Sequence, residues 1–315
     1  MRYAAILVYL SLLILGAGIE SAPGHRLQSQ TPPAQRSVAV TVDDLPTTRG
    51  SLESMWDITD GLLRHMADHG IVATGFVNEG KLAVAGERDA RGAILEAWLD
   101  AGHDLGNHTY SHPSLYTTPL ADFEADVIRG EIVTGKLLAD RGRELRYFRH
   151  PMLNTGPDRQ TRAEFEAFLG DRGYMVAPVT IDNDEYLYAR AYEHALADGD
   201  AELVDRIGAA YVSYMEAVFG FYERLSLTVL EREPAQILLL HANALNRDLL
   251  GVLATRLELR GYRFVSLDEA LADPAYRLAD EYVGRRGLSW LQRWAITMGR
   301  EPGEQPGAVG WVRGY

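Results

Sequence analysis

The sequence predicts an α/β protein built on a parallel β-sheet. Short β-branched runs alternate with longer segments of helical periodicity from Ser37 onward, and this alternation implies parallel strands joined by right-handed helical crossovers. Polar residues follow five of the seven predicted strands, as expected when an active site is built at the carboxyl ends of the strands. A barrel and a doubly wound open sheet both fit this pattern.

The predicted elements follow one another in a regular order. The strands are residues 38–42, 71–77, 104–107, 146–149, 175–181, 236–240 and 263–267. Helical periodicity is clearest in residues 122–138 and 185–230. Residues 277–298 also look helical, and we expect their stripe of Trp290, Leu291 and Trp294 to pack against the sheet rather than to grip sugar rings. Residues 301–315 contain two Pro and four Gly, which predicts a loose tail.

The N-terminus has the order of a secretory signal. Arg2 precedes an uncharged apolar stretch, and small residues follow between Gly16 and Ala22. We therefore expect residues 1–22 to be a signal peptide and residues 23–36 to be a linker. The protein would be exported, either to a periplasm or out of the cell. An uncleaved signal that anchors the chain in a membrane is the alternative, which the shortness of the apolar stretch disfavours.

Composition limits the kinds of partner and cofactor. The chain has 315 residues, a formal net charge of −13 and no cysteine. The acidic balance argues against nucleic acid, because binding to a phosphate backbone needs clustered Lys and Arg. Without cysteine there is no lipoprotein anchor, disulfide or thiolate metal site, so any metal must be held by His, Asp or Glu. No sequence feature indicates a protein partner.

The strongest chemical signal combines two strand ends. The first predicted strand runs into Asp43 and Asp44, whose like charges repel unless a metal or an Arg compensates them. The third runs into His108 and His112, and a spacing of four would direct both imidazoles to one side of a helical turn. One carboxylate and two imidazoles suit a metal ion that keeps coordination positions open. A solvated turn is the alternative for the Asp pair.

Three further strand ends carry polar side chains. Arg149 ends the fourth predicted strand, Asp182 the fifth and His241 the sixth. Each alone is a weak signal, because a charged residue at a strand end is usually just solvated. Their joint presence is typical of an active site at the carboxyl ends of a barrel.

Five motifs in the chain resemble those of the polysaccharide deacetylase (NodB-homology) family, over roughly residues 37–270. They are Thr41-Val-Asp-Asp44, His108-Thr-Tyr-Ser-His112, Arg149-His-Pro151, Asp182-Asn-Asp-Glu-Tyr186 and Leu239-Leu-His241. The resemblance implies a distorted seven-stranded (β/α) barrel in a single domain. We assign that domain to residues 37–273 and a C-terminal helical extension and tail to residues 274–315.

The resemblance also implies roles for individual residues. Asp44, His108 and His112 would bind one divalent metal ion, usually zinc. Asp43 would be the general base and Arg149 would orient it. His241 would be the general acid, tuned by an acidic residue such as Asp182. The backbone N–H of Met152 would help to hold the oxyanion, and Leu239 would line the acetyl pocket.

The chain departs from the family pattern around these positions. Leu45 and Pro46 follow the Asp pair where the family commonly has Gly, and Ala242-Asn243 follows His241 where Asp is frequent. Met152 replaces a Tyr or Phe, and Glu185-Tyr186 replaces an Asp-Trp pair. The predicted ligands and acid–base residues are all retained, so the changes bear on the floor of the cleft and on the substrate.

The function implied by the resemblance is hydrolysis of a carbon–nitrogen bond other than a peptide bond. The substrate would be an acetylated amino-sugar polymer or oligomer, such as peptidoglycan, a chitin-like chain or an exopolysaccharide, and the reaction would remove N-acetyl groups. Two alternatives remain. The same site could cleave an O-acetyl ester or a small amide, or the barrel could be a catalytically inactive carbohydrate-binding protein.

Overall fold

The computed structural model describes residues 36–315. The strands are β1 (Arg36–Leu45), β2 (Thr74–Val77), β3 (Asp104–Asn107), β4 (Tyr147–Phe148), β5 (Met175–Val176), β6 (Gln236–His241) and β7 (Tyr262–Val265). The α-helices are α1 (Leu52–Asp68), α2 (Arg88–Asp100), α3 (Leu120–Arg129), α4 (Ile132–Ala139), α5 (Arg159–Asp171), α6 (Glu185–Asp198), α7 (Ala201–Leu230), α8 (Ala244–Leu259), α9 (Leu267–Leu271) and α10 (Trp290–Thr297). Four short 3₁₀ turns are η1 (Glu79–Leu82), η2 (Pro151–Leu153), η3 (Pro274–Arg277) and η4 (Val312–Gly314). The predicted signal peptide and almost all of the predicted linker lie outside the described residues.

All the strands are parallel and belong to one curled sheet. Its order is β5-β4-β3-β2-β1-β6, and β7 also pairs with β1. The first half of β1 pairs with β7 and the second half with β2, so β7 does not separate β6 from β1 as it would in a regular barrel. Ile181, beyond β5, forms a parallel bridge to Leu238 of β6 and so brings the two edges of the sheet together. The predicted distorted barrel is confirmed, and the doubly wound open sheet is wrong.

The interior of the curled sheet has an apolar floor and a polar top layer. A buried cluster takes residues from five strands and from the segment after β5, namely Ala39, Phe76, Tyr147, Ala177, Ile237 and Val265. Side chains alternate along a strand, so the next inward positions are Thr41 and Asp43 on β1. Their register partners on β6 are Leu239 and His241. The alternation therefore delivers the predicted acid and base to the same end of the interior.

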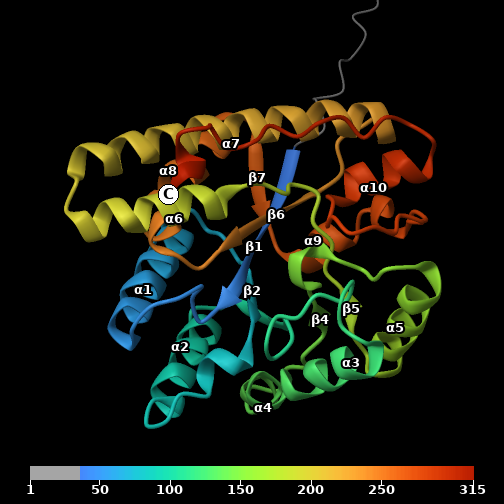
Figure 1. The fold of residues 1–315 in the computed structure, drawn as a ribbon, viewed down its shortest axis with the longest axis horizontal. Helices are drawn as coiled ribbons and strands as arrows, with labels where there is room; N and C mark the ends of the chain where they lie inside the picture. The colour runs from blue at the N-terminus through green and yellow to red at the C-terminus, as the bar shows by residue number, and fades with distance from the viewer. Residues whose placement is uncertain (1–35) are drawn as a thin grey trace, which may run out of the picture. The chain divides into compact units, whose positions relative to one another are not determined.

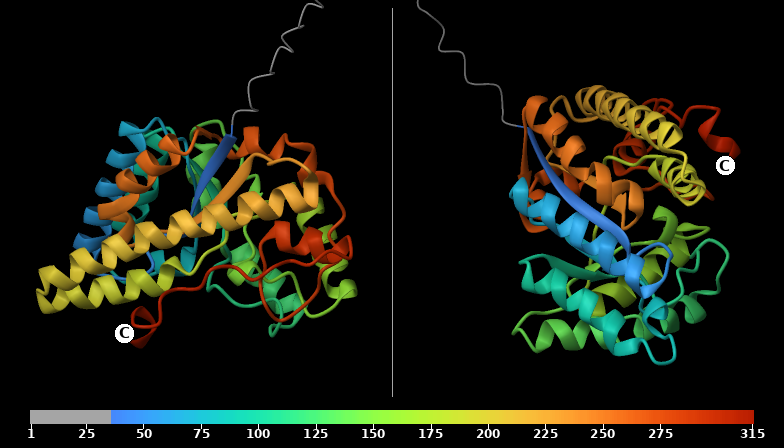
Figure 2. Two further views of the ribbon diagram at one scale, coloured as in Figure 1. Left: turned by 90° about the horizontal axis from the view of Figure 1, so that it is seen from above. Right: turned by 90° about the vertical axis from the view of Figure 1, so that its left-hand side faces the viewer.

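Helices surround this sheet (Figure 1). A large buried cluster joins the outward residues of β1 to apolar residues of α1, α6, α7 and α8. Helices α6 and α7 form a long antiparallel pair that crosses one side of the sheet (Figures 1 and 2). Within residues 36–315, no helix combines the length and apolarity needed to cross a membrane.

Each of the two long helical predictions corresponds to two helices in the structure. In residues 122–138 the break is at Gly130, where a Cβ would lie 2.6 Å from the carbonyl carbon of Thr109. A glycine here lets the end of α3 approach the loop that carries the two histidines. In residues 185–230 the break is at Gly199, whose left-handed φ of 69° ends α6.

The predicted helix over residues 277–298 is wrong except for α10. Residues 278–289 contain two interrupting glycines, and a Cβ at Gly287 would lie 1.8 Å from the Met152 carbonyl oxygen. This irregular segment therefore packs closely on the loop after β4. Within α10, Trp290, Leu291 and Trp294 are buried, so the prediction that they pack against the body of the protein is confirmed.

The loose tail predicted for residues 301–315 is also wrong. Val312 is fully buried and Ala308 nearly so. The Ala308 amide donates to Asp184 Oδ2 at 3.1 Å, and Arg206 stacks over the Trp311 ring at 4.3 Å. The tail therefore packs on α6 and α7, next to the loop that follows β5.

Candidate metal centre and active site

Asp44, His108 and His112 converge at the carboxyl ends of β1 and β3. One ligand atom from each residue lies within 4.8 Å of the other two. Asp44 has a φ of 71°, in the left-handed region that is costly for residues other than glycine. The register between β1 and β2 shifts between Val42 and Leu45. An irregularity of this kind re-aims side chains, which is how the adjacent Asp43 and Asp44 can both serve the site.

The tautomer of His108 suits metal binding. Its Nδ1 lies 2.8 Å from the backbone oxygen of Arg149. Because that oxygen can only accept, Nδ1 carries the proton and Nε2 is left free to bind a cation. Burial holds the pKa of His108 well below its usual range, so the imidazole is neutral. Two imidazoles and a carboxylate fit a divalent ion such as zinc.

The histidine loop, residues 108–112, is not the helical turn that the spacing predicts. Thr109 has a left-handed φ of 67°, and its amide donates to Asn107 Oδ1 at 2.7 Å. Asp126 of α3 accepts hydrogen bonds from the amide and the hydroxyl of Ser111 at 2.8 and 2.9 Å. The imidazoles converge because these hydrogen bonds shape the loop, with ring centroids 4.8 Å apart.

Asp43 is a buried carboxylate with a free oxygen. Its exposure is 3%, and its Oδ1 has no hydrogen-bond partner among the described residues. Arg149 Nη1 lies 3.5 Å from that oxygen. Burial raises the pKa of Asp43 to about 6, although the Arg149 charge lowers it. The group is thus ionised at neutral pH and can accept a proton.

Arg149 is held rigidly below Asp43. Its Nη2 donates to Thr41 Oγ1 at 2.9 Å, and its guanidinium lies 4.5 Å from the centre of the Phe76 ring. The ring has room because Gly106 lies beside it, where a Cβ would be 2.4 Å from a ring carbon. Arg149 is therefore held in place beside Asp43, and its orienting function stays a prediction.

His241 pairs with Glu185, a residue that we did not assign from the sequence. His241 Nδ1 lies 2.8 Å from Glu185 Oε2. The other carboxylate oxygen, Oε1, accepts from the side-chain amides of Asn243 and Asn246. Burial alone would lower the pKa of His241, but the hydrogen bond and the charge of Glu185 raise it to about 9. At neutral pH the imidazole is therefore protonated.

This pairing corrects the assignment of Asp182 as the residue that tunes His241. Glu185, and not Asp182, is the carboxylate hydrogen-bonded to His241. Asp182 lies nearby, and burial raises the pKa of its carboxyl to about 6. The sequence did contain a signal. Glu185 starts a helix directly after a polar strand end, and it stands where the family pattern has Asp.

Leu239 and Met152 lie at the same end of the sheet. Leu239 is 7% exposed and pairs in register with Thr41, beneath the polar layer. Met152 lies in η2, directly after the β4 end, with a left-handed φ of 53° and a half-exposed side chain. Their assigned functions in the acetyl pocket and the oxyanion site stay predictions.

Lys81 is a second residue that sequence reasoning missed. It lies in η1, which follows β2, and its Nζ is 3.3 Å from Asp44 Oδ1. The same amine donates to the Asp44 backbone oxygen at 2.9 Å. Burial alone would raise the pKa of Asp44, but Lys81 and the nearby histidines hold it below its usual range. No motif marks Lys81, so only the path of the chain reveals it.

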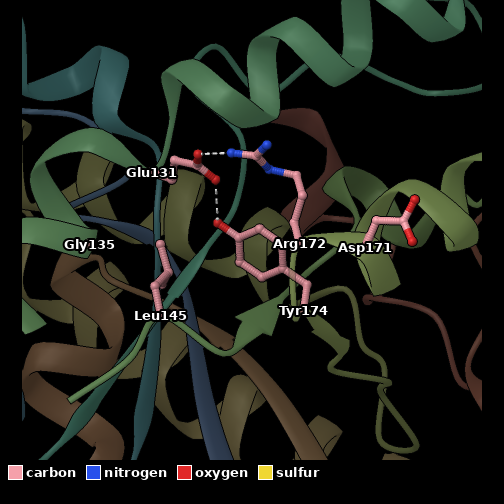
Figure 3. Close-up of a pocket in the computed structure, with 6 residues that line it drawn as sticks. All are labelled: Glu131, Gly135, Leu145, Asp171, Arg172 and Tyr174. Carbon is pink, nitrogen blue, oxygen red and sulfur yellow. Dashed lines mark hydrogen bonds and ion pairs between the residues drawn. The ribbon is translucent and has the colours of Figure 1, made fainter. Parts of the chain in front are cut away.

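A surface cavity of about 450 Å³ lies outside this cluster of residues. It is lined by Glu131, Gly135, Leu145, Asp171, Arg172 and Tyr174. Figure 3 shows Arg172 and the Tyr174 hydroxyl both directed at the Glu131 carboxylate. The Tyr174 hydroxyl also accepts from Asn107 Nδ2 at 3.0 Å. None of the predicted site residues lines the cavity. Tyr174 in its wall nevertheless contacts Asn107, the last residue of β3, which precedes His108.

Fold and site together define a class: an α/β protein with a curled parallel sheet and a candidate two-histidine, one-carboxylate centre at the carboxyl ends of its strands. Residues 30–166 match the polysaccharide deacetylase family model. These residues therefore match a polysaccharide deacetylase domain, and the family resemblance of the first three motifs is confirmed. The match contains the first three motifs and ends before Asp182 and His241.

Two known proteins illustrate the relationship. A chitin deacetylase from Colletotrichum lindemuthianum is 29% identical over 149 residues, which are 47% of this chain and 52% of that protein. The chain thus matches about half the length of that relative. The solved structure of the chitin deacetylase from this fungus is 22% identical, with a TM-score of 0.50, over 80% of this chain and 95% of that chain. A family 4 carbohydrate esterase from Streptomyces lividans is 20% identical, with a TM-score of 0.46, over 75% and 95%.

Proposed function

We propose that this chain is a metal-dependent hydrolase that removes N-acetyl groups from an amino-sugar polymer or oligomer. The observation that carries the proposal is a pair of titratable groups beside the candidate metal centre. The pKa of Asp43 is about 6 and that of His241 is about 9. At neutral pH the first is an ionised base and the second a protonated acid, the two states that hydrolysis of an amide requires.

Each step of the reaction is assigned to one residue or group. A divalent ion held by Asp44, His108 and His112 would supply Lewis acidity toward the acyl carbonyl and toward water. Asp43, oriented by Arg149, takes a proton from the attacking water. The backbone N–H of Met152 donates to the oxygen on which negative charge develops. His241 Nε2 gives its proton to the amine nitrogen as the carbon–nitrogen bond breaks, which leaves acetate and a free amine.

The substrate, the metal and the compartment complete the proposal. The family domain and the name of the chitin deacetylase relative support an acetylated amino-sugar polymer. Peptidoglycan, chitin-like chains and exopolysaccharides are the candidates. Zinc is the expected ion because the ligand set contains two imidazoles. The apolar stretch after Arg2 supports export to a periplasm or out of the cell.

Release of acetate tests the reaction directly. The purified, zinc-loaded protein is incubated with acetylated chitin oligomers, peptidoglycan fragments and an acetylated exopolysaccharide, and acetate is measured. Release from at least one of them, abolished by a chelator and restored by zinc, is expected. Release from O-acetyl esters alone would make the chain an esterase. Binding of these sugars without any release would make it a carbohydrate-binding barrel.

Export has its own test. N-terminal sequencing of the protein recovered from its producing cell should find a mature chain that begins near Gly18–Ala22. A cytoplasmic chain that begins at Met1 would contradict the proposal. A chain that begins at Met1 but fractionates with membranes would instead support an uncleaved anchor.

A further inference from the structure

Lys81 makes a close contact with the candidate metal ligand Asp44. The amine lies 3.3 Å from the carboxylate oxygen Oδ1 and donates to the backbone oxygen of the same residue at 2.9 Å. Both contacts bind Lys81 to a residue with a left-handed backbone. The structure thus places a fixed positive charge next to an oxygen that a metal ion would use.

The two adjacent aspartates are neutralised by different cations. Arg149 Nη1 lies 3.5 Å from Asp43 Oδ1, while Lys81 Nζ lies 3.3 Å from Asp44 Oδ1. Arg149 is fully buried below the site, whereas the Lys81 side chain retains 26% of its exposure. Without these partners, two neighbouring carboxylates would repel one another in a partly desolvated site. Each aspartate therefore has a compensating charge that does not depend on a bound ion.

The backbone of Lys81 is anchored, so its position is not that of a freely moving surface lysine. Its carbonyl accepts from Arg91 Nη1 at 2.8 Å and its amide donates to the Asn78 oxygen at 3.0 Å. Asn78 in turn donates from Nδ2 to the backbone oxygen of His108 at 2.6 Å. The η1 turn is thus tied to the histidine loop on one side and to α2 on the other.

We propose that Lys81 is a counter-cation of the metal centre, which neutralises Asp44 while no ion is bound and weakens the binding of a divalent ion. The inference rests on the proposed metal centre. A divalent ion at Asp44 would share one carboxylate with the Lys81 amine, and like charges at such short range repel strongly in a partly buried site. The lysine thereby stabilises the metal-free protein and lowers its affinity for metal.

The chain offers a matched control, because Lys81 and Lys136 are its only lysines. Lys136 of α4 is exposed and pairs with Asp140, the residue that follows this helix. We would compare wild type with Lys81→Met, Lys81→Arg and Lys136→Met, each stripped of metal. Lys81→Met removes the charge and keeps most of the side-chain volume, whereas Lys81→Arg keeps the charge. The readouts are the Kd for Zn²⁺ and Mn²⁺ by chelator competition and the Tm with and without metal.

Lys81→Met should bind both ions at least about tenfold more tightly than wild type, which corresponds to about 1.4 kcal/mol. Its metal-free Tm should fall, so the rise in Tm on adding metal should be larger than in wild type. Lys81→Arg should stay within about threefold of the wild-type Kd, and Lys136→Met should match wild type in every readout. If metal-free Lys81→Met does not fold, Lys81→Gln takes its place.

The outcomes separate this inference from the proposed function. If wild type binds neither ion, the metal centre itself is wrong. If wild type binds an ion and Lys81→Met binds it equally or more weakly, the counter-cation is wrong while the metal centre stands. Equal tightening in Lys81→Arg would also overturn the inference, because the charge would not be the cause.

Discussion

The candidate site has two halves that are built in different ways. The metal and base half consists of Asp43, Asp44, the histidine loop and Arg149, all within the stretch that matches the family model. Its residues stand at the ends of β1, β3 and β4 and are readable as short motifs. The acid half consists of His241 and Glu185, which lie 56 positions apart and beyond that stretch.

The difference shows which groups are placed by local structure at strand ends and which are placed by the packing of distant elements. In the first half each group lies at or just beyond a strand end, and local features bring the groups together: the register shift after Val42 and the hydrogen bonds that shape the histidine loop. In the second half the start of α6 must be held against the end of β6 before Glu185 can reach His241. Helix α7 and the C-terminal tail pack against α6. We therefore expect mutations in the first half to affect the metal and mutations in the second half to affect proton transfer.

Loss of a metal ligand should have the largest effect. His108→Ala removes a buried imidazole whose Nδ1 is already fixed by the Arg149 carbonyl. The variant should lose the bound divalent ion, and acetate release should fall by more than the roughly 10²–10⁴-fold that general-base catalysis supplies. Elemental analysis and acetate release measure the two effects. Asp44→Ala and His112→Ala should behave alike, and unchanged metal content in all three would disprove the ligand set.

Asp43→Asn should separate chemistry from metal binding. The substitution keeps the size of the side chain but removes its ability to accept a proton. We expect metal content and fold to be retained, with kcat lowered roughly 10²–10⁴-fold and KM little changed. Asp44→Asn is the comparison, because it should lose the ion instead. The reverse result, with the ion lost from Asp43→Asn and kept in Asp44→Asn, would exchange the two functions.

The pH profile should distinguish Glu185 from Asp182 as the partner of His241. Glu185 raises the pKa of His241 to about 9, so the acid is protonated below that pH and activity should fall as the pH rises through it. Glu185→Gln removes the raising charge and should move the alkaline limb of kcat to lower pH. At a pH above the new pKa, each unit by which the pKa of His241 falls lowers the protonated fraction of its imidazole about tenfold.

Asp182→Asn is the matched control for that experiment, and its alkaline limb should move less. The acidic limb should remain in both variants, because Asp43 must lose its proton and its pKa is about 6. A larger shift in Asp182→Asn than in Glu185→Gln would restore the assignment that the motif resemblance suggested.

Packing behind the histidine loop should have the smallest effect on activity. Gly130→Ala would place a Cβ 2.6 Å from the backbone of Thr109, so overpacking should cost about 1–3 kcal/mol of unfolding free energy. Displacing the loop should also weaken metal binding a few-fold. Gly135→Ala is the control, since its nearest neighbouring atom is 4.0 Å away and alanine favours a helix. Equal stability of the two variants in thermal unfolding would contradict this account.

Much of the sheet and of the metal half was predictable because the signals are local. All seven strands were predicted near their observed positions, since runs of β-branched residues between polar ends identify buried parallel strands. The combination of one carboxylate with two histidines followed from the chemistry of the ligands, and the family resemblance identified Asp44 as that carboxylate. The helical turn expected for residues 108–112 was wrong, because Asn107 and Asp126 impose a different backbone on that loop.

What the sequence by itself determined is the set of strands, the polar strand ends and the kinds of ligand available in a chain without cysteine. Tertiary structure alone decided which groups meet across long separations. Glu185 reaches His241 and Lys81 reaches Asp44 because separate elements pack at one end of the sheet. Periodicity records which face of a strand or helix is buried, but it does not record which neighbour covers that face. The partners of His241 and Asp44 therefore became visible only in the folded chain.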